Sequence, residues 1–294
     1  MIDLHLHTTA SDGRLTPTEL VTRAAAAGVT TMSVTDHDTV ASIAEVTALA
    51  APLGIRVVPG IEVTSVDNGR DVHVLAYFID PGSAALMTFL EKQRALRVSR
   101  VREIDERLTA LGLAVDLESV WQSALDRPGS SVGRPQIAAA LVAAGHVGSL
   151  QEAFDKWLAT GMPAFVPRTG PSPADVVRFV HEVGGIASLA HPAVTKRDDL
   201  IGSLAEHGLD AIEVYHSDHT PEDEREYLNQ SIRFNLAVSG GSDFHGEDPS
   251  ASGRSRRSTI GVVSLPADAF AGLEARARSR QKSACSQQNG RAPL

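Results

Sequence analysis

The chain has 294 residues, of which 43% are apolar and 21% charged, which is typical of a soluble globular protein with one large or two ordinary domains. Its net charge of -9 argues against a general nucleic-acid-coating surface, although a local basic patch could still bind a phosphate. The single cysteine, Cys285, excludes an internal disulfide framework. With no signal-peptide pattern and no run of 18 apolar residues, we expect a cytoplasmic protein without a membrane span.

Short apolar runs alternate with helical patterns through the first 82 residues. The segment 16–28 predicts a helix with Thr16 as N-cap, Pro17 in the first turn, Glu19 at the capping-box position and a stop at Gly28. We expect strands at 1–6, 29–36, 55–65 and 71–79, and a second helix at 40–54. This alternation predicts a parallel α/β sheet or barrel.

The pattern changes between residues 83 and 168, where only helices are predicted. A long amphipathic helix is expected at 84–112, followed by shorter helices at 117–126, 134–145 and 149–161. We interpret this stretch as a helical insertion that covers the active site.

Strands and helices alternate again after residue 168. Helices are expected at 172–185, 199–208, 221–235 and 268–279, with strands at 186–192, 209–216 and 236–246 and an apolar run at 259–266. The predicted domains are a barrel formed by 1–82 and 169–279 and the insertion at 83–168. The tail 280–294 lacks periodicity and is predicted to be disordered.

Seven of the eleven histidines and several carboxylates fall at or near predicted strand ends. In a parallel α/β fold these ends meet at one edge, so the side chains are expected to gather there. Imidazoles and carboxylates are both ligands for divalent metal ions. The candidates are His5, His7, Asp12, Asp36, His37, Asp38, Glu62, His73, His191, His216, Asp243 and His245.

The spacing of the first two histidines strengthens this hypothesis. His5 and His7 lie two residues apart in a predicted strand, so both side chains point to one face and can chelate one ion. Each candidate alone has an ordinary explanation, such as a core histidine, a helix cap or a turn. Burying so many unpaired ionisable groups would cost several kcal/mol each, so a cluster of cations is the simplest common cause.

Four segments, HLHTTASDG, TDHD, AHP and SDFH, resemble the motifs of the PHP family, the polymerase-and-histidinol-phosphatase metal-dependent phosphoesterases. The resemblance covers residues 1–262 and implies a distorted (β/α)7 TIM-like barrel that holds two or three divalent ions, either Mn, Fe or Zn. The helical segment is similar to that of standalone members, which include nucleotide phosphatases and RNase AM-like 5′→3′ exonucleases. One departure is Gln136, where many members have histidine.

The resemblance also implies which residues hold each ion. It assigns His5, His7, Glu62 and Asp243 to a first site, Asp12, His37 and His245 to a second, and Glu62, His73 and His191 to a third. Because every expected ligand is present, a degenerate copy without catalytic activity is not expected.

Clustered divalent cations favour phosphate ester hydrolysis because they acidify a bound water, hold phosphate oxygens and neutralise developing charge. The expected nucleophile is a hydroxide that bridges the first two ions. Arg134 is expected to clamp the phosphate, with a surface arginine as the alternative. His216 is expected to contact the phosphate or protonate the leaving oxygen, or else to support the metal ligands. Asp36 and Asp38 either orient His37 or cap the loop.

The function we expect is hydrolysis of phosphate monoesters of a small nucleotide, such as AMP or a 3′,5′-nucleoside bisphosphate. The first alternative is a 5′→3′ exonuclease on short RNA or DNA, which a content of only 4% aromatic residues disfavours because single strands bind by base stacking. Histidinol phosphate hydrolysis and a metal-dependent binding module are further alternatives. The basic segment 253–258 either attracts an anionic substrate or forms a flexible loop, and the sequence does not fix the oligomeric state.

Overall fold

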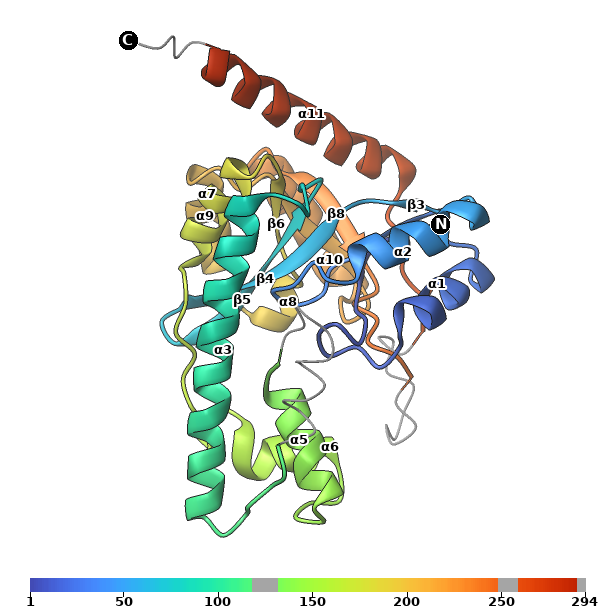
Figure 1. Cartoon of the computed structure of the whole chain (residues 1–294). Helices are drawn as coiled ribbons and strands as arrows, with labels where there is room; N and C mark the ends of the chain where they lie inside the picture. The colour runs from blue at the N-terminus through green and yellow to red at the C-terminus, as the bar shows by residue number, and fades with distance from the viewer. Residues whose placement is uncertain (118–131, 248–258, 290–294) are drawn as a thin grey trace.

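The computed structural model describes residues 1–117, 132–247 and 259–289, with side chains as far as Lys282 (Figure 1). All but the first residue of the helix expected at 117–126 lies outside these described residues. The basic segment 253–258 also lies outside them. The remaining elements show a mixed α/β fold, in agreement with the predicted class.

Eight strands in the described part of the chain form two sheets, ordered β1-β2-β3 and β4-β5-β6-β7-β8. The strands are β1 (Ile2–Leu6), β2 (Thr31–Val34), β3 (Arg56–Val57), β4 (Gly60–Asp67), β5 (Arg70–Tyr77), β6 (Ile186–Leu189), β7 (Ala211–His216) and β8 (Ala237–Gly241). The prediction of parallel strands throughout was wrong for β5, which runs antiparallel to both β4 and β6. The reason is local, because Asn68 and Gly69 both have positive φ and form a two-residue hairpin turn between β4 and β5. Parallel strands would need a much longer crossover connection, usually a helix.

Two isolated parallel bridges link segments that follow strands of the first sheet to the second sheet. Leu6 at the end of β1 pairs with Phe244 beyond β8, and His37 beyond β2 pairs with Glu62 on β4. These bridges bring the carboxyl ends of β1, β2 and β8 close to β4. Across residues 1–117, 132–247 and 259–289, no continuous hydrogen-bonded ladder closes the strands into a barrel, so barrel closure stays a prediction.

The helices largely begin and end where the sequence indicates. They are α1 (Pro17–Ala26), α2 (Ile43–Ala50), η1 (Ala51–Leu53), α3 (Ala84–Ala110), α5 (Arg134–Ala143), α6 (Leu150–Ala153), η2 (Phe154–Leu158), α7 (Pro173–Glu182), α8 (Pro192–Thr195), α9 (Asp199–Glu206), α10 (Pro221–Arg233) and α11 (Ala267–Asn289). The predicted capping box is present: the Glu19 N–H donates to the Thr16 hydroxyl, and the Glu19 carboxylate accepts from the Thr16 N–H. The short helix α8 was not predicted, and it follows His191 directly.

The apolar side chains pack into separate clusters. In the insertion, Ile104 and Leu108 of α3 pack against Ile137 and Leu141 of α5, away from the sheets. The first turns of α3 instead pack with α7 against β4, β5 and β6. Figure 1 shows α3 running from beside β4 and β5 to the end of the molecule that carries α5 and α6. The long helix therefore ties the insertion to the sheet.

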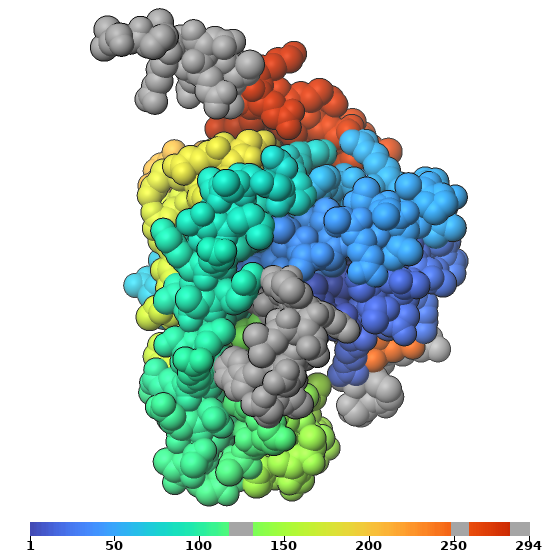
Figure 2. Space-filling view, viewed as in Figure 1, coloured from blue at the N-terminus to red at the C-terminus, as the bar shows by residue number. Residues whose placement is uncertain are grey.

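Helix α11 lies at the opposite end of the molecule from α5 and α6 (Figures 1 and 2). Leu273 of α11 packs with Leu4 and Tyr77, and the Leu265 N–H donates to the Ile2 carbonyl at the start of β1. Helix α11 therefore packs against the start of β1, at the end of the molecule away from α5 and α6. None of the described helices combines the length and apolarity needed to span a membrane.

The predicted disorder of the tail was wrong for residues 280–289, because α11 continues through Asn289. Arg280 helps to hold it: its guanidinium donates to the Asp210 carboxylate at 2.9 Å and to the Gly208 carbonyl at 2.8 Å. The segment 280–289 also contains no proline or glycine that would end a helix.

Candidate metal centre

The strands and the loops that follow them carry the predicted metal ligands into one region. His5 lies on β1 and His7 follows it directly, Glu62 lies on β4 and His73 on β5, while Asp243 follows β8. The loops after β1, β2, β6 and β8 contribute the other candidates, which are Asp12, His37, His191 and His245. Gly241 allows the closest approach, because a Cβ there would lie 2.3 Å from the His5 nitrogen and 2.5 Å from its Cβ.

The first cluster is fully enclosed. His5 Nε2 lies 3.3 Å from both Glu62 Oε2 and Asp243 Oδ1, and His7 Nε2 lies 3.3 Å and 3.2 Å from the same two oxygens. His5, His7 and Glu62 have no exposed surface, and Asp243 is 2% exposed. The structure therefore brings together the four residues predicted for the first ion site.

The second cluster is adjacent and more open. Asp12 lies with one oxygen 3.3 Å from His245 Nε2 and the other 3.7 Å from His37 Nε2. The His245 Nδ1–H donates to the backbone carbonyl of Asp243 at 2.8 Å, which leaves Nε2 free to bind an ion. One ligand atom from each of His7, Asp12, His37 and His245 falls within a group 4.8 Å across.

The third group surrounds the other oxygen of Glu62. Glu62 Oε1 lies 2.8 Å from His73 Nδ1 and 3.0 Å from His191 Nε2. Glu62 Oε2 faces the first cluster and lies 3.1 Å from His37 Nδ1. The carboxylate of Glu62 thus lies between the first cluster and His37 on one side and His73 and His191 on the other. This is the bridging position predicted for it.

Several buried polar atoms in these clusters face one another without forming a hydrogen bond. Within the part of the chain that the structure describes, five ligand atoms lack a hydrogen bond: His5 Nε2, His7 Nδ1, His7 Nε2, His37 Nδ1 and Glu62 Oε2. An unsatisfied buried polar atom costs about 1–3 kcal/mol, more if it is charged. Bound cations would satisfy these atoms together, and the mixed imidazole and carboxylate donors fit divalent ions.

The charges of the carboxylates reinforce this conclusion. Burial by itself would raise the pKa of Glu62, but His37, His73 and His5 outweigh it and hold that pKa well below its usual range. Burial has the opposite effect on a histidine and by itself would lower the pKa of His7. The interactions of His7 with Asp243 and Glu62 outweigh burial and raise its pKa to about 10. The carboxylates therefore stay ionised and demand positive charge beside them, which protons or metal ions can supply.

A buried glutamate that the sequence analysis missed orients two of the candidate ligands. Glu213 on β7 accepts a hydrogen bond from His5 Nδ1 at 2.9 Å and another from the His191 N–H at 2.8 Å. The first bond fixes the His5 tautomer and leaves its Nε2 for an ion. A charged residue inside the apolar run AIEVY was the available sequence signal, since a glutamate is rarely buried without a partner.

Of the two roles predicted for Asp36 and Asp38, orienting His37 or capping a loop, the hydrogen bonds of Asp36 fit the second. Asp36 accepts hydrogen bonds from the Thr8 N–H and from the Thr8 and Ser11 hydroxyls, all at 2.7 Å. It therefore fixes the loop that carries Asp12. Asp38 instead pairs with Arg97 of the insertion at 2.6 Å.

Two candidate ligands have an unusual backbone conformation. His191 has φ of 28° and Asp243 has φ of 53°, a region that residues with a Cβ rarely adopt. Such strain costs on the order of 1–3 kcal/mol and persists where the surroundings hold it in place. The Glu213 bond to the His191 N–H is one such restraint.

The two predicted catalytic residues differ in their contact with these clusters. His216 is buried, and its Nε2 lies 3.2 Å from Asp243 Oδ2 while its Nδ1 accepts from the Asp218 N–H at 3.1 Å. Arg134 contacts none of the candidate ligands: its guanidinium lies 3.3 Å from Asp71 and 3.4 Å from the Leu158 carbonyl.

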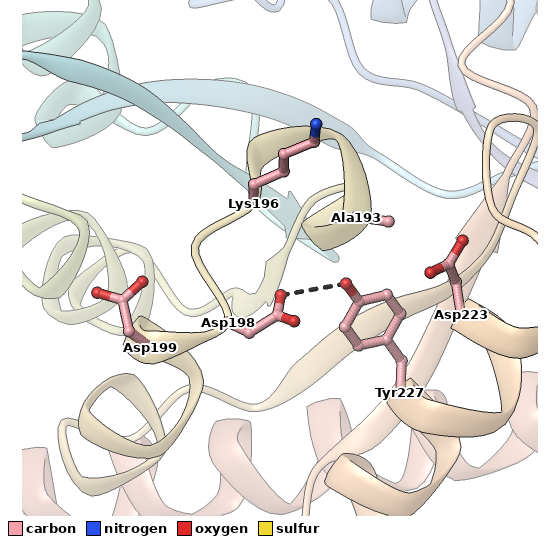
Figure 3. A pocket seen from close by; sticks show the side chains of 6 residues that line it. All are labelled: Ala193, Lys196, Asp198, Asp199, Asp223 and Tyr227. Atoms are coloured by element: carbon pink, nitrogen blue, oxygen red, sulfur yellow. Dashed lines mark hydrogen bonds between the residues drawn. The ribbon is translucent and has the colours of Figure 1, made fainter.

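A separate hollow of about 390 Å³ opens beside α8 and α10 (Figure 3). The side chains of Asp198, Asp199, Asp223, Lys196 and Tyr227 line it, and the Tyr227 hydroxyl donates to Asp198. None of the candidate metal ligands lines this hollow. Three carboxylates against one lysine would repel a phosphate, so the hollow does not belong to the metal centre.

Comparison with known proteins agrees with the geometry. A family model described as PHP domain matches residues 3–126. The chain is 35% identical to the 3′,5′-nucleoside bisphosphate phosphatase of Chromobacterium violaceum, over 94% of this chain and 97% of that protein. It is 34% identical to the 5′-3′ exoribonuclease Rnm of Salmonella typhimurium, over 83% of this chain and 84% of that protein. The crystal structure of a metal-dependent phosphoesterase from Bifidobacterium adolescentis matches with a TM-score of 0.82 and 31% identity, over 94% of this chain and 96% of that chain.

Proposed function

The chain belongs to the PHP family of metal-dependent phosphoesterases, and on that premise we propose that it hydrolyses phosphate monoesters of small nucleotides. The observation that carries the proposal is the convergence of five unsatisfied, buried ligand atoms around Glu62. When bound there, divalent cations would acidify a water molecule and neutralise the oxygens of a phosphate.

We assign the ion-holding residues as the clusters group them. His5, His7 and Asp243 would hold one ion, and the second would be held by Asp12, His37 and His245. Glu62 would bridge to a third position completed by His73 and His191. Mn, Fe and Zn all suit these donors, and the metal supplied by the cell decides among them.

The role we propose for His216 is to position Asp243. Because its Nδ1 accepts from the Asp218 N–H, the neutral ring carries its proton on Nε2, which points at Asp243 Oδ2. That proton is held by a carboxylate inside a buried region, so His216 is poorly placed to protonate a leaving group. Arg134 is proposed to bind phosphate at the edge of the centre through its guanidinium.

We favour a nucleotide as the substrate because of the similarity to the Chromobacterium violaceum phosphatase. The alignment with that relative covers 94% of this chain and 97% of the relative, more than the alignment with Rnm covers. A 5′→3′ exonuclease acting on short RNA or DNA is the second candidate, supported by the similarity to Rnm. Both activities would use the same metal centre and differ in the length of nucleic acid that the surrounding surface accepts.

We also propose that the seven strands β1, β2, β4, β5, β6, β7 and β8 act as a distorted barrel, with 83–168 as an inserted domain. The two isolated bridges at Leu6 and His37 support a ring in this order. The separate apolar cluster between α3 and α5 supports the domain assignment.

The test is a substrate panel with Mn²⁺-loaded protein. Nucleoside 5′-monophosphates, 3′,5′-bisphosphates, histidinol phosphate and a 5′-phosphorylated oligonucleotide would be compared by phosphate release and by gel. We expect the highest kcat/KM with a mononucleotide. A ladder of products that forms faster than mononucleotide hydrolysis would favour the exonuclease, and inertness towards the whole panel would refute the enzyme assignment.

A further inference from the structure

The first two ion sites differ in what positions their ligands. His5 and Glu62 of the first site lie in strands, and their side chains are at most 1% exposed. Asp12 and His37 of the second site lie in the loops after β1 and β2, with side chains that are 16% and 13% exposed. Loops are generally more mobile than the strands that they connect. The geometry of the second site therefore depends on what holds these two loops.

The insertion holds the first loop through Gln136, which lies in the first turn of α5. The Gln136 Nε2 amide donates to the Ser11 carbonyl at 2.8 Å, across 125 positions of the sequence. Its Oε1 accepts from the Gly133 N–H at 2.9 Å, which fixes the orientation of the amide. Ser11 directly precedes Asp12, so its carbonyl belongs to the planar peptide group that leads into this ligand. Gln136 therefore restrains the backbone at Asp12.

The insertion holds the second loop through Arg97 of α3. Asp38 directly follows His37, and its N–H donates to the Glu62 carbonyl of β4 at 2.9 Å. One carboxylate oxygen of Asp38 accepts from the Thr64 N–H at 2.8 Å, and the other accepts from Arg97 Nε at 2.6 Å. Asp38 has φ of 52°, a conformation that persists only where the surroundings hold it. Arg97 and β4 together supply that restraint beside His37.

Asp36 joins the two loops to each other. It directly precedes His37 in the second loop. Its carboxylate accepts from the Thr8 N–H and from the Ser11 hydroxyl of the first loop, both at 2.7 Å. A shift of the first loop would therefore affect His37 as well as Asp12. The two contacts from the insertion thus act on one connected pair of loops.

We propose that the insertion positions the second ion site, with Gln136 and Arg97 as its positioning residues. This inference rests on the proposed metal centre and adds that its more open site is built by the sheets and the insertion together. The second ion binds tightly only while the insertion is docked on the two loops. Because such linkage is reciprocal, the second ion strengthens the docking of the insertion by the same factor.

The experiment is a calorimetric titration of metal-free protein with Mn²⁺ in the absence of substrate. Asp12→Ala, which removes a ligand, identifies the binding step of the second site. Gln136→Leu keeps the approximate size of the side chain but loses the hydrogen bond to Ser11. Loss of this bond should raise the dissociation constant of the second step about two- to tenfold. The step of the first site should stay unchanged.

Ser149→Ala is the matched control, because it also removes a helix-capping bond inside the insertion. The Ser149 hydroxyl accepts that bond from the Glu152 N–H at 3.1 Å. This variant should leave both binding steps as they are in the wild type. Equal weakening of both steps in Gln136→Leu, or no change in either step, would overturn the inference.

Arg97→Lys tests the second contact by the same titration. It keeps a positive charge beside Asp38 but loses the planar guanidinium that reaches both Asp38 and the Thr64 hydroxyl. We expect the second step to weaken and the first step to stay unchanged, as in Gln136→Leu. If Gln136→Leu does not fold by circular dichroism, Arg97→Lys decides the inference by the same criterion.

A failure of the proposed function would be recognised separately, because the titration needs no substrate. A protein that hydrolyses none of the nucleotides but shows selective weakening of the second step would lose the function and retain this inference. A protein that hydrolyses nucleotides but has no second binding step would retain the function and refute this inference.

Discussion

At the amino ends of the strands, buried carboxylates are fully engaged by the protein itself. Asp210 has no exposed surface, and it accepts hydrogen bonds from His181 at 2.7 Å, Arg280 at 2.9 Å and the Ala187 N–H at 3.0 Å. Asp3 accepts from both the N–H and the hydroxyl of Ser242. In the candidate metal centre, Glu62 Oε2 is equally buried, but the imidazole nitrogens that lie 3.1–3.3 Å from it form no hydrogen bond with it.

This difference distinguishes carboxylates with a structural role from carboxylates that can bind an ion. A carboxylate that the protein satisfies contributes to folding, whereas one left unsatisfied next to unsatisfied imidazoles is prepared for an ion. Substitutions at the two ends should therefore have separate consequences, for activity at one end and for stability at the other.

The largest expected effect follows from Glu62→Gln, because an amide cannot bridge cations as a carboxylate does. We expect kcat/KM to fall about a thousandfold or more, since several kcal/mol of electrostatic stabilisation are lost. Metal content per chain, measured by mass spectrometry, should fall as well. Glu222→Gln on the surface of α10 is the control, and a Glu62→Gln variant with full activity and full metal content would contradict the assignment.

The substitution Asp210→Asn tests the structural role of the buried carboxylate that precedes β7. Burial would raise the pKa of Asp210, but the bond from His181 and the other donors lower it below its usual value. The ionised carboxylate therefore stabilises the fold fully above the unfolded-state pKa near 4, and this stabilisation is lost as the pH falls through the lower folded-state pKa. We expect Asp210→Asn to lower the free energy of unfolding by about 3 kcal/mol at pH 7.

Urea unfolding in the presence of a chelator at pH 7 and pH 3.5 would measure this effect. The difference between wild type and Asp210→Asn should shrink at the lower pH. A difference that stays constant with pH would show that the carboxylate charge is not what stabilises this end.

A smaller effect is expected for Glu213→Gln, which removes the carboxylate that orients His5 without removing a ligand. Such outer partners typically change metal affinity about 10- to 100-fold. Competition with a metal-binding dye would give the dissociation constant, and Glu213→Asp should recover part of the affinity. An unchanged constant in Glu213→Gln would leave Glu213 a purely structural residue.

The smallest effect concerns the junction with the insertion. Gln136 accepts from the Gly133 N–H at 2.9 Å and donates to the Ser11 carbonyl at 2.8 Å, next to Asp12. Gln136→Ala should destabilise the protein by about 1 kcal/mol, measured by urea unfolding. Gln151→Ala, which removes an exposed side chain, should change stability less, and equal effects would argue against a link across the junction.

The sequence itself was enough for the identity of the metal-site candidates and for most element boundaries. The spacing of His5 and His7, and the carboxylates after predicted strands, are local patterns that depend on strand periodicity. The helix that begins after Thr16 could be predicted from its capping box, which is also a local pattern. The continuation of α11 past residue 279 did not follow, because its anchor, the bond between Arg280 and Asp210, joins residues 70 positions apart.

Only the tertiary structure decided which partners the buried charged side chains have. The antiparallel β4–β5 hairpin places Thr64 beside Arg97 and Asp71 beside Arg134, and the fold brings Glu213 to His5 across 208 residues. Charge pairing of this kind depends on distance in space, which a single sequence does not encode locally. For that reason the sequence indicated which side chains are candidate ligands for divalent ions, and the fold decided which of them lie together and which partners each one has.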